Sequence, residues 1–398
     1  NPVKPDMSQD PLVVTTHASW LQRLGGALAG MAVGVILVLG GLTLLFGNEG
    51  RAVRAAQTLD EGGRLATSAS PDRIDPAQEG RPIHVVGMAQ AAGPLSDEST
   101  GLRISGLRLV RKVELYQWVE TVRTETRTRL GGGEETVATY DYRLEWSSLP
   151  VDSDGFKQPQ GHVNPEPILK DQDFSTPQIR LGRRRLGPEA AAGLPATETV
   201  VLLAGDAQEA ERRLGRKVVV SGDALYVGAD PALPAVGDAR IRYAAAPWGP
   251  ISVIAGQQGA DLVPYATRHG RLYEVRAGRL DAETMLQDAK AANQVLTWLV
   301  RLGGAVAIIL GLALILNPAK VAADVFPPAG AIVGFGVVAL AFIFGAILSA
   351  LTIATAWLVV RPLLSVVVLT LGALVALGIW RLKAARGTRS EPRVVGTQ

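Results

Sequence analysis

The sequence of 398 residues contains no cysteine and only four histidines. Without cysteine the chain can form neither a disulfide nor a thiolate metal site. The histidines, His17, His84, His162 and His269, are isolated in the sequence, and no pair has the spacing of a metal site on a helix. We therefore expect no metal and no cofactor. The missing cysteines leave the compartment open, because an exported domain of this size needs no cross-links.

Sequence signatures of catalysis are missing as well. The chain has no glycine-rich phosphate loop, no P-loop and no G-x-S-x-G elbow. Glu114, Glu120 and Glu145 could face one another across a hairpin as an acid/base pair, but cross-strand ion pairs with neighbouring arginines account for them more simply. The Arg183–Arg185 run could bind acidic lipid or a partner, or form a solvated loop. We expect no catalytic residues, no enzyme activity and no nucleic-acid partner.

Charged residues make up 19% of the chain and are nearly absent from four long windows. One uncharged run extends from Gly25 to Gly47, and three more lie in the last hundred or so residues. About 20 apolar residues in a helix match the thickness of the hydrocarbon core of a bilayer. The predicted fold class is therefore a multi-span α-helical membrane protein with four transmembrane helices, arranged one plus three. Between the first two lies a large β-rich extracytoplasmic α+β domain.

The fourth helix follows from the length of the last apolar stretch. Gly330 to Trp380 would form a single helix of about 75 Å, more than twice the thickness of the hydrocarbon core, so the stretch must turn back on itself. Its one charged residue, Arg361, stands directly before Pro362 and marks the turn. Basic residues after Trp380 indicate a cytoplasmic C-terminal tail by the positive-inside rule.

These features predict an ordered series of segments. In order, they are a cytoplasmic tail (1–24), a first transmembrane helix (25–47), the β-rich domain (48–295), a second transmembrane helix (296–316), a cytoplasmic loop (317–329), a third transmembrane helix (330–356), a fourth transmembrane helix (361–380) and a basic cytoplasmic tail (381–398). The abundance of arginine over lysine, with much alanine and glycine, indicates a GC-rich bacterial genome. We accordingly expect a multi-pass protein of the bacterial inner membrane with a periplasmic domain.

Small residues recur within the spans. Gly26, Gly30 and Gly34 lie four apart, and Gly330 and Gly334 repeat the spacing, which predicts close helix packing within or between chains. The alternative is that glycine is simply common in this protein. The polar residues noted within the spans are serines and threonines, none ionisable, which argues against proton or ion transport.

The predicted domain is mostly strand. The stretch from Leu107 to Arg129 alternates, turns at three glycines and returns through Thr136 to Trp146, which predicts a long hairpin. A charged helix from Asp281 is predicted to run without a break into the second span. In the loop Gly161–Pro165, His162 is a candidate site residue that Asn164 or Asp173 could orient. The alternative is a turn in which His162 and Asn164 satisfy backbone groups.

Several stretches, in order along nearly the whole chain, resemble the transmembrane protein 43 (LUMA) family. They include Asn48-Glu49-Gly50-Arg51-Ala52, Val113-Glu114-Leu115-Tyr116-Gln117-Trp118-Val119-Glu120, Gly161-His162-Val163-Asn164-Pro165, Pro234-Ala235-Val236-Gly237-Asp238, and Trp357-Leu358 with Arg361-Pro362-Leu363. The resemblance implies four spans, a large lumenal domain and self-association. For animal members it implies the endoplasmic reticulum or inner nuclear membrane, with lamins and emerin as partners. It supplies no catalytic residues.

Three functional hypotheses follow. The leading one is a non-enzymatic membrane scaffold that forms homo-oligomers in the lipid bilayer and organises other membrane proteins, with Arg361, Pro362, His162 and Asn164 as candidate interface or loop residues. The second is a lipid-binding or channel-like protein. The third is a membrane-tethered hydrolase that uses His162 and nearby acidic residues.

Overall fold

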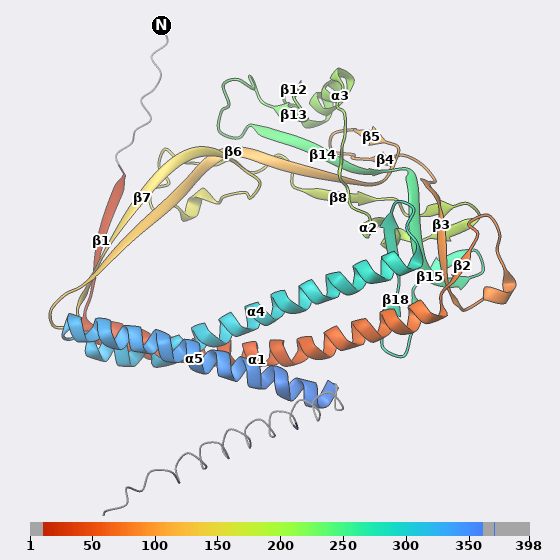
Figure 1. Ribbon diagram of the computed structural model, residues 1–398. Helices are drawn as coiled ribbons and strands as arrows, with labels where there is room; N and C mark the ends of the chain where they lie inside the picture. Colours follow the sequence, from red (N-terminus) through yellow and green to blue (C-terminus); the bar gives the residue numbers. More distant parts are fainter. Residues whose placement is uncertain (1–10, 361–369, 371–398) are drawn as a thin grey trace, which may run out of the picture. The chain divides into compact units, whose positions relative to one another are not determined.

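The computed structural model describes residues 11–360 and residue 370, and it consists of two compact units. Unit 1 contains residues 11–18, Ala56–Arg129 and Glu134–Ala292. Among the described residues, unit 2 contains Ser19–Ala55, the short segment Leu130–Gly133, and residues 293–360. Helices α1 (Trp20–Leu65) and α4 (Ala282–Ala323) each contribute to both units (Figure 1).

Unit 1 contains two main sheets. The larger is an eight-stranded sheet with the order β1-β7-β6-β14-β13-β12, to which β8 and β11 add at β6 and β14. Its long hairpin pairs without interruption from Leu115 opposite Ser147 to Thr128 opposite Glu134, as the sequence predicts. The strands are β1 (Leu12–Ala18), β6 (Gly106–Thr128), β7 (Glu134–Ser147), β8 (Gln172–Ser175), β11 (Glu198–Thr199), β12 (Val218–Ser221), β13 (Ala224–Val227) and β14 (Ala239–Pro247).

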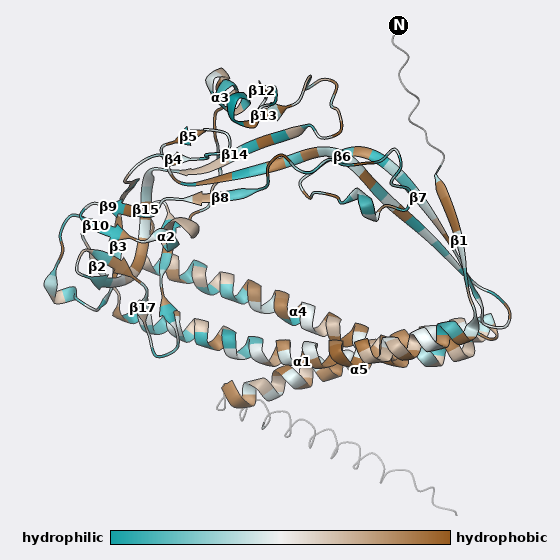
Figure 2. Cartoon of the chain, turned by 180° about the vertical axis from the view of Figure 1, so that it is seen from behind, coloured by the Kyte–Doolittle hydropathy of each residue, from teal (hydrophilic) through white to brown (hydrophobic). Residues whose placement is uncertain are grey.

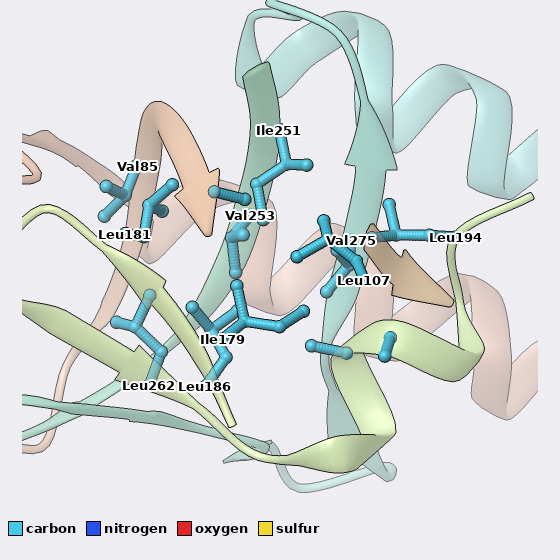
Figure 3. Close-up of a cluster of buried hydrophobic side chains, with 14 of the residues drawn as sticks. Val85, Leu107, Ile179, Leu181, Leu186, Leu194, Ile251, Val253, Leu262 and Val275 are labelled. Carbon is cyan, nitrogen blue, oxygen red and sulfur yellow. The ribbon is translucent and has the colours of Figure 1, made fainter. Parts of the chain in front are cut away.

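The second sheet closes on itself, because β3, β15, β16, β10 and β9 form a ring in which each strand pairs with its two neighbours. Its interior is an apolar core in which Val85, Leu181, Val253 and Leu262 point toward one another (Figure 3). The strands are β2 (Thr67–Ala69), β3 (Pro82–Ala91), β9 (Ile179–Leu181), β10 (Arg184–Leu186), β15 (Gly249–Gln258), β16 (Asp261–Val263) and β19 (Glu274–Ala277).

Smaller elements complete unit 1. Two short helices belong to this unit, and α3 (Ala204–Leu214) covers the large sheet with Ala207 and Ala210 in its core. The residues of α1 and α4 that belong to unit 1 pack together through Leu59 and Met285. The remaining elements are α2 (Pro188–Ala192), α3 (Ala204–Leu214), two 3₁₀ turns (Pro76–Gln78 and Ser153–Gly155), and two-stranded ribbons formed by β4 (Leu95–Ser96) with β5 (Arg103–Ile104) and by β17 (Tyr265–Ala266) with β18 (Arg271–Leu272).

Unit 2 is a bundle of three apolar helices formed by parts of α1 and α4 together with α5 (Pro327–Val360). Figure 2 shows hydrophobic residues along α5 and along the adjoining parts of α1 and α4. Within the described residues, these three helices are long and apolar enough to cross a membrane. The predicted fourth helix (361–380), with Arg361 and Pro362, lies outside the described residues, as does the basic tail.

The helices and strands extend past several of the predicted segment boundaries. Residues 12–18, assigned to a tail, form strand β1 of the large sheet. Beyond the predicted end of the first span at Gly47, α1 continues as one helix to Leu65. The second helix is longer than the predicted 296–316, because α4 includes Pro318 and continues to Ala323. The predicted loop 317–329 is therefore reduced to the short segment between α4 and α5.

Candidate functional site

The most polar site in unit 2 joins all three of its helices, and we call it the Glu49 clasp. Arg301 of α4 donates to both carboxylate oxygens of Glu49, with Nε–Oε1 2.7 Å and the second bond 2.8 Å. The indole Nε1 of Trp357, near the end of α5, donates to Glu49 Oε2 at 2.8 Å. Glu49 is only 2% exposed. A buried carboxylate is stable when several donors surround it, and here one carboxylate ties α1, α4 and α5 together.

A second set of polar side chains extends the Glu49 clasp by about one helical turn. The guanidinium of Arg51 donates to the side-chain oxygens of Asn48, Asn293 and Thr297. Asn48 in turn donates to the Thr297 carbonyl, and Asn293 to the Ala52 carbonyl. Polar side chains that cross between helices and find partners in this way fix the register of α1 against α4.

Arg301 corrects the prediction about the spans. It lies inside the predicted second span 296–316, so that span does contain an ionisable residue. The signal was visible in the sequence as a lone charge in an apolar window, but its partner Glu49 is 252 residues away. Trp298 and Trp357 flank the guanidinium, with ring centroids 4.8 and 6.0 Å from its central carbon. The charge is paired and stacked, which is the geometry of a structural contact.

At the other end of the bundle, three segments meet, which we call the tip contact. The loop of the β6–β7 hairpin, residues 130–133, lies against the start of α1 and the α4–α5 connection. Arg23 donates to the Gly132 carbonyl at 2.7 Å and pairs with Asp324 at 2.5 Å. The Gly131 amide donates to the Val325 carbonyl at 3.0 Å, and the Trp20 indole to the Val321 carbonyl at 2.8 Å. The predicted topology places residues 130–133 on the opposite side of a membrane from both other segments.

The glycines predicted to pack helices differ in how closely a neighbouring helix approaches them. At Gly34 a Cβ would lie 2.6 Å from the carbonyl oxygen of Gly311, so α1 and α4 touch there backbone to backbone. Gly30 is looser, with Leu314 at 3.9 Å, and at Gly26 nothing lies within 4 Å. The close approach thus lies within one chain. On α5, the second predicted pair, Gly330 and Gly334, leaves room for the side chains of Asp324 and Lys320.

An apolar groove of about 710 Å³ lies among the three helices of unit 2, and we call it the bundle groove. Two polar side chains, Asn317 and Lys320 of α4, accompany its apolar lining. Within residues 11–360, no ion pair of Lys320 is found. The apolar lining is formed by Leu37, Leu310, Ala313, Leu314, Ala331, Gly334, Phe335, Val337 and Val338.

The predicted loop site lies in unit 1 and is a packing site. Asn164 accepts from the Trp118 amide at 2.8 Å and donates to the Trp118 carbonyl at 2.9 Å, so its side chain acts as a strand partner for β6. His162 is fully buried, with its ring stacked on Tyr142 at 4.0 Å and edge-on to Trp118 at 4.7 Å. Its Nδ1 lies 2.9 Å from the Gln158 carbonyl. The alternative reading, in which both residues satisfy backbone groups, accounts for this geometry.

The three glutamates weighed as an acid/base pair do not pair with one another, and two of them form ion pairs with arginines, the simpler of the two interpretations. Glu114 pairs with Arg242 at 2.6 Å, and Glu145 with Arg143 at 2.8 Å. Glu120 instead accepts from the Tyr142 hydroxyl at 2.7 Å. Burial and the Glu120 carboxylate raise the pKa of Tyr142 to about 12. Among the described residues, no group of three His, Asp or Glu side chains is arranged to hold a metal.

Two buried arginines of unit 1 were not identified from the sequence. Arg111 pairs with Asp97 at 2.6 Å, where both side chains are nearly inaccessible, and Tyr243 donates to the same carboxylate. Arg184, from the run expected to be a solvated loop or lipid site, is fully buried in β10 and donates to Gln257 and to the carbonyls of Ser70 and Arg73. Burial lowers the pKa of Arg184. The positive charge of the Arg184 guanidinium is therefore stabilised by the dipoles of the carbonyl and amide groups that accept its hydrogen bonds.

A β-rich unit and three long apolar helices, joined within one chain, define a membrane protein with a large β-rich domain. A model of the family described as transmembrane protein 43 matches residues 115–362. The rat protein named transmembrane protein 43 is 32% identical over 359 residues, covering 86% of this chain and 88% of its own. The human protein of that name is 31% identical, covering 88% and 89%. The chain belongs to the transmembrane protein 43 family.

The similarity extends to an insect relative and does not extend to a solved structure. The Drosophila melanogaster homolog is 29% identical over 290 residues, covering 70% of this chain and 74% of its own. No solved structure matches the chain significantly. The stretches that carry the resemblance meet in the structure: β6 at Trp118 contacts Asn164, and Tyr116 exchanges backbone bonds with Gly237 and Asp238.

Proposed function

We propose that this protein is a non-enzymatic integral membrane scaffold that associates with further copies and organises other membrane proteins. The observation that carries the proposal is how polar and apolar side chains are used in unit 2. The charged residues of the Glu49 clasp bond to one another and so hold the helices together. Large apolar side chains of α5 are instead exposed, among them Ile332, Phe335 and Phe342. An extensive apolar surface that no other part of residues 11–360 covers fits lipid and protein neighbours.

Mass measurement in lipid nanodiscs tests self-association, because lateral contacts survive there. A defined oligomer is expected. Phe335 and Phe342 are seven residues apart and so share one face of α5, and replacing both with alanine should shift the mass toward monomer. Leu21→Ala, at an equally exposed apolar position of α1, is the matched control. A strict monomer in nanodiscs and in mild detergent would contradict the scaffold.

A second candidate function, lipid binding, is favoured by the bundle groove. Its apolar lining suits an acyl chain, and the Lys320 ammonium suits an anionic headgroup. Native mass spectrometry with phosphatidylglycerol or phosphatidylcholine added should show preferential retention of the anionic lipid. Lys320→Gln should abolish that preference and Lys320→Arg should keep it. Arg54→Gln removes an exposed cation of α1 outside the groove and should change nothing. Equal retention of both lipids by the unaltered protein would contradict an anionic site.

The surroundings of His162 argue against the hydrolase hypothesis. His162 is enclosed by two aromatic rings and the Gln158 carbonyl. A general base must reach the proton that it removes, and this ring is fully buried.

A further inference from the structure

The tip contact bears on how the chain meets a membrane. Arg23 and Asp324 are bonded to each other, and Gly132 and Gly131 of the hairpin loop are bonded to Arg23 and Val325. Just before α1, strand β1 pairs with β7 from Leu12 opposite Tyr140 to Ala18 opposite Glu134 (Figure 1). Hydrogen-bonded segments share one environment. The start of α1, the end of α4 and the hairpin loop therefore lie on one side of the membrane or inside it together.

The hairpin itself is unsuited to cross a bilayer. Its outer half carries Arg123, Glu125 and Arg127, whose side chains are about four-fifths exposed. A charged side chain on the lipid face of a strand is unfavourable, most of all at the bilayer midplane and for arginine. The sheet is also open, with β1 at its edge, and unpaired backbone groups of an edge are not tolerated in hydrocarbon. The hairpin loop is accordingly on the same side as the rest of its sheet.

The continuity of the helices completes the argument. α1 begins two residues after β1 ends and continues unbroken into unit 1 after Ala55. α4 leaves unit 1 after Ala292 and ends beside the hairpin loop. A single unbroken helix whose two ends lie on one side of a membrane does not cross it.

We propose that the apolar bundle of unit 2 enters the membrane from one side only and lies along a single leaflet, in contact with its acyl chains. The dimensions are compatible, because a helix about 10 Å in diameter fits within the hydrocarbon of one leaflet, which is about 15 Å thick. The part of α1 in unit 2 is about 55 Å long, far longer than a crossing requires. Each helix contains a long apolar window and has no separate polar face along its length, which favours immersion among acyl chains over a position at the headgroups. The proposal does not depend on the scaffold role.

Because the chain has no cysteine, single-cysteine variants test this directly. Leu233→Cys marks the β-rich unit, Leu130→Cys the hairpin loop and Val325→Cys the α4–α5 connection, all at exposed positions. Each variant is probed with a membrane-impermeant maleimide in sealed vesicles of both orientations, with thermal stability as a check on folding. The expected result is labelling of all three from one and the same side.

Three results would overturn the proposal. Labelling of Val325→Cys from the side opposite to Leu233→Cys would establish crossing helices. If Leu130→Cys shared that opposite side, the hairpin itself would cross. Labelling of Leu130→Cys and Val325→Cys only after detergent is added would place the tip contact inside the hydrocarbon.

Discussion

At the scale of single residues, the buried carboxylate of Asp97, bonded to Arg111 and Tyr243, makes the stability of unit 1 depend on pH. Burial alone would raise the pKa of Asp97, but hydrogen bonds from Tyr243 and Arg111 and the Arg111 charge outweigh burial and hold the pKa below its ordinary value of 3.8. A carboxylate with a depressed pKa stabilises the folded state above its unfolded pKa. This contribution is therefore complete at neutral pH and is lost as the pH falls below about 3.8 toward the folded pKa.

Replacing Asp97 with asparagine should cost about 3–5 kcal/mol of unfolding free energy, because it leaves the buried Arg111 guanidinium without a counter-charge. Denaturant unfolding of the full chain in mild detergent measures this loss at pH 7. The difference from the unaltered protein should shrink as the pH is lowered below about 4. Asp173→Asn is the control, since its pair with Arg108 is half-exposed and should contribute at most about 1 kcal/mol. Equal losses for the two variants would contradict the role given to Asp97.

The sequence identified which residues were unusual better than it identified their partners. Asn164 and His162 stood out by their loop context, and the packing role left open for them is what the structure contains. Arg301 and Arg184 were not recognised as buried, because burial of an arginine depends on acceptors elsewhere in the chain, here Glu49 and Gln257. A charged run or a lone charge gives no information about distant acceptors.

At the scale of elements, the Glu49 clasp should determine how tightly the three apolar helices associate. Glu49→Ala leaves the guanidinium of Arg301 unpaired and should lower the unfolding free energy by about 3–5 kcal/mol. Asp60→Asn removes the exposed pair between α1 and Lys290 and should cost at most about 1 kcal/mol. Tryptophan fluorescence during denaturation in detergent reports the change, since Trp357 contacts Glu49. If the Glu49 variant costs no more than the Asp60 variant, the clasp is not a stabilising contact.

The glycines on α1 offer a second comparison between elements. Gly34→Ala should destabilise the bundle by about 1–3 kcal/mol, because the new methyl group would collide with the Gly311 backbone. Gly26→Ala meets open space and should be neutral or stabilise the helix by up to about 1 kcal/mol. Thermal stability of the two variants in the same detergent decides between them. Equal effects would show that this close approach does not hold α1 against α4.

The local sequence pattern predicted an element correctly where the segments that pair or continue are close together in the sequence. The hairpin of β6 and β7 follows from alternation and three glycines, and the helix from Asp281 into the apolar run follows from the lack of a breaker. Strand β1 could not be predicted in this way, because its partner lies about 120 residues further along the chain. The ends of the long helices were also missed, since hydropathy marks where a helix becomes polar and not where it stops.

At the scale of the whole molecule, the unit boundary falls inside continuous helices. Residues 56–65 of α1 and 282–292 of α4 belong to unit 1, where Leu59, Met285 and Ala289 share a core with Leu272. The preceding part of α1 and the following part of α4 belong to the apolar bundle. Separately packed units of a protein can open separately, each with its own free energy of opening. We therefore expect the two parts of each helix to open with different free energies, each part together with its own unit.

Hydrogen exchange measured by mass spectrometry on the full chain tests this division. Asp97→Asn should speed exchange throughout unit 1, including residues 56–65 and 282–292, and leave the apolar parts of α1 and α4 unchanged. Gly34→Ala should do the reverse. Perturbations at separate sites without shared partners act independently, so the double variant should show both changes with no further effect. Faster exchange along the whole of α1 in either single variant would mean that the molecule opens as one cooperative unit, with the helices as the connection.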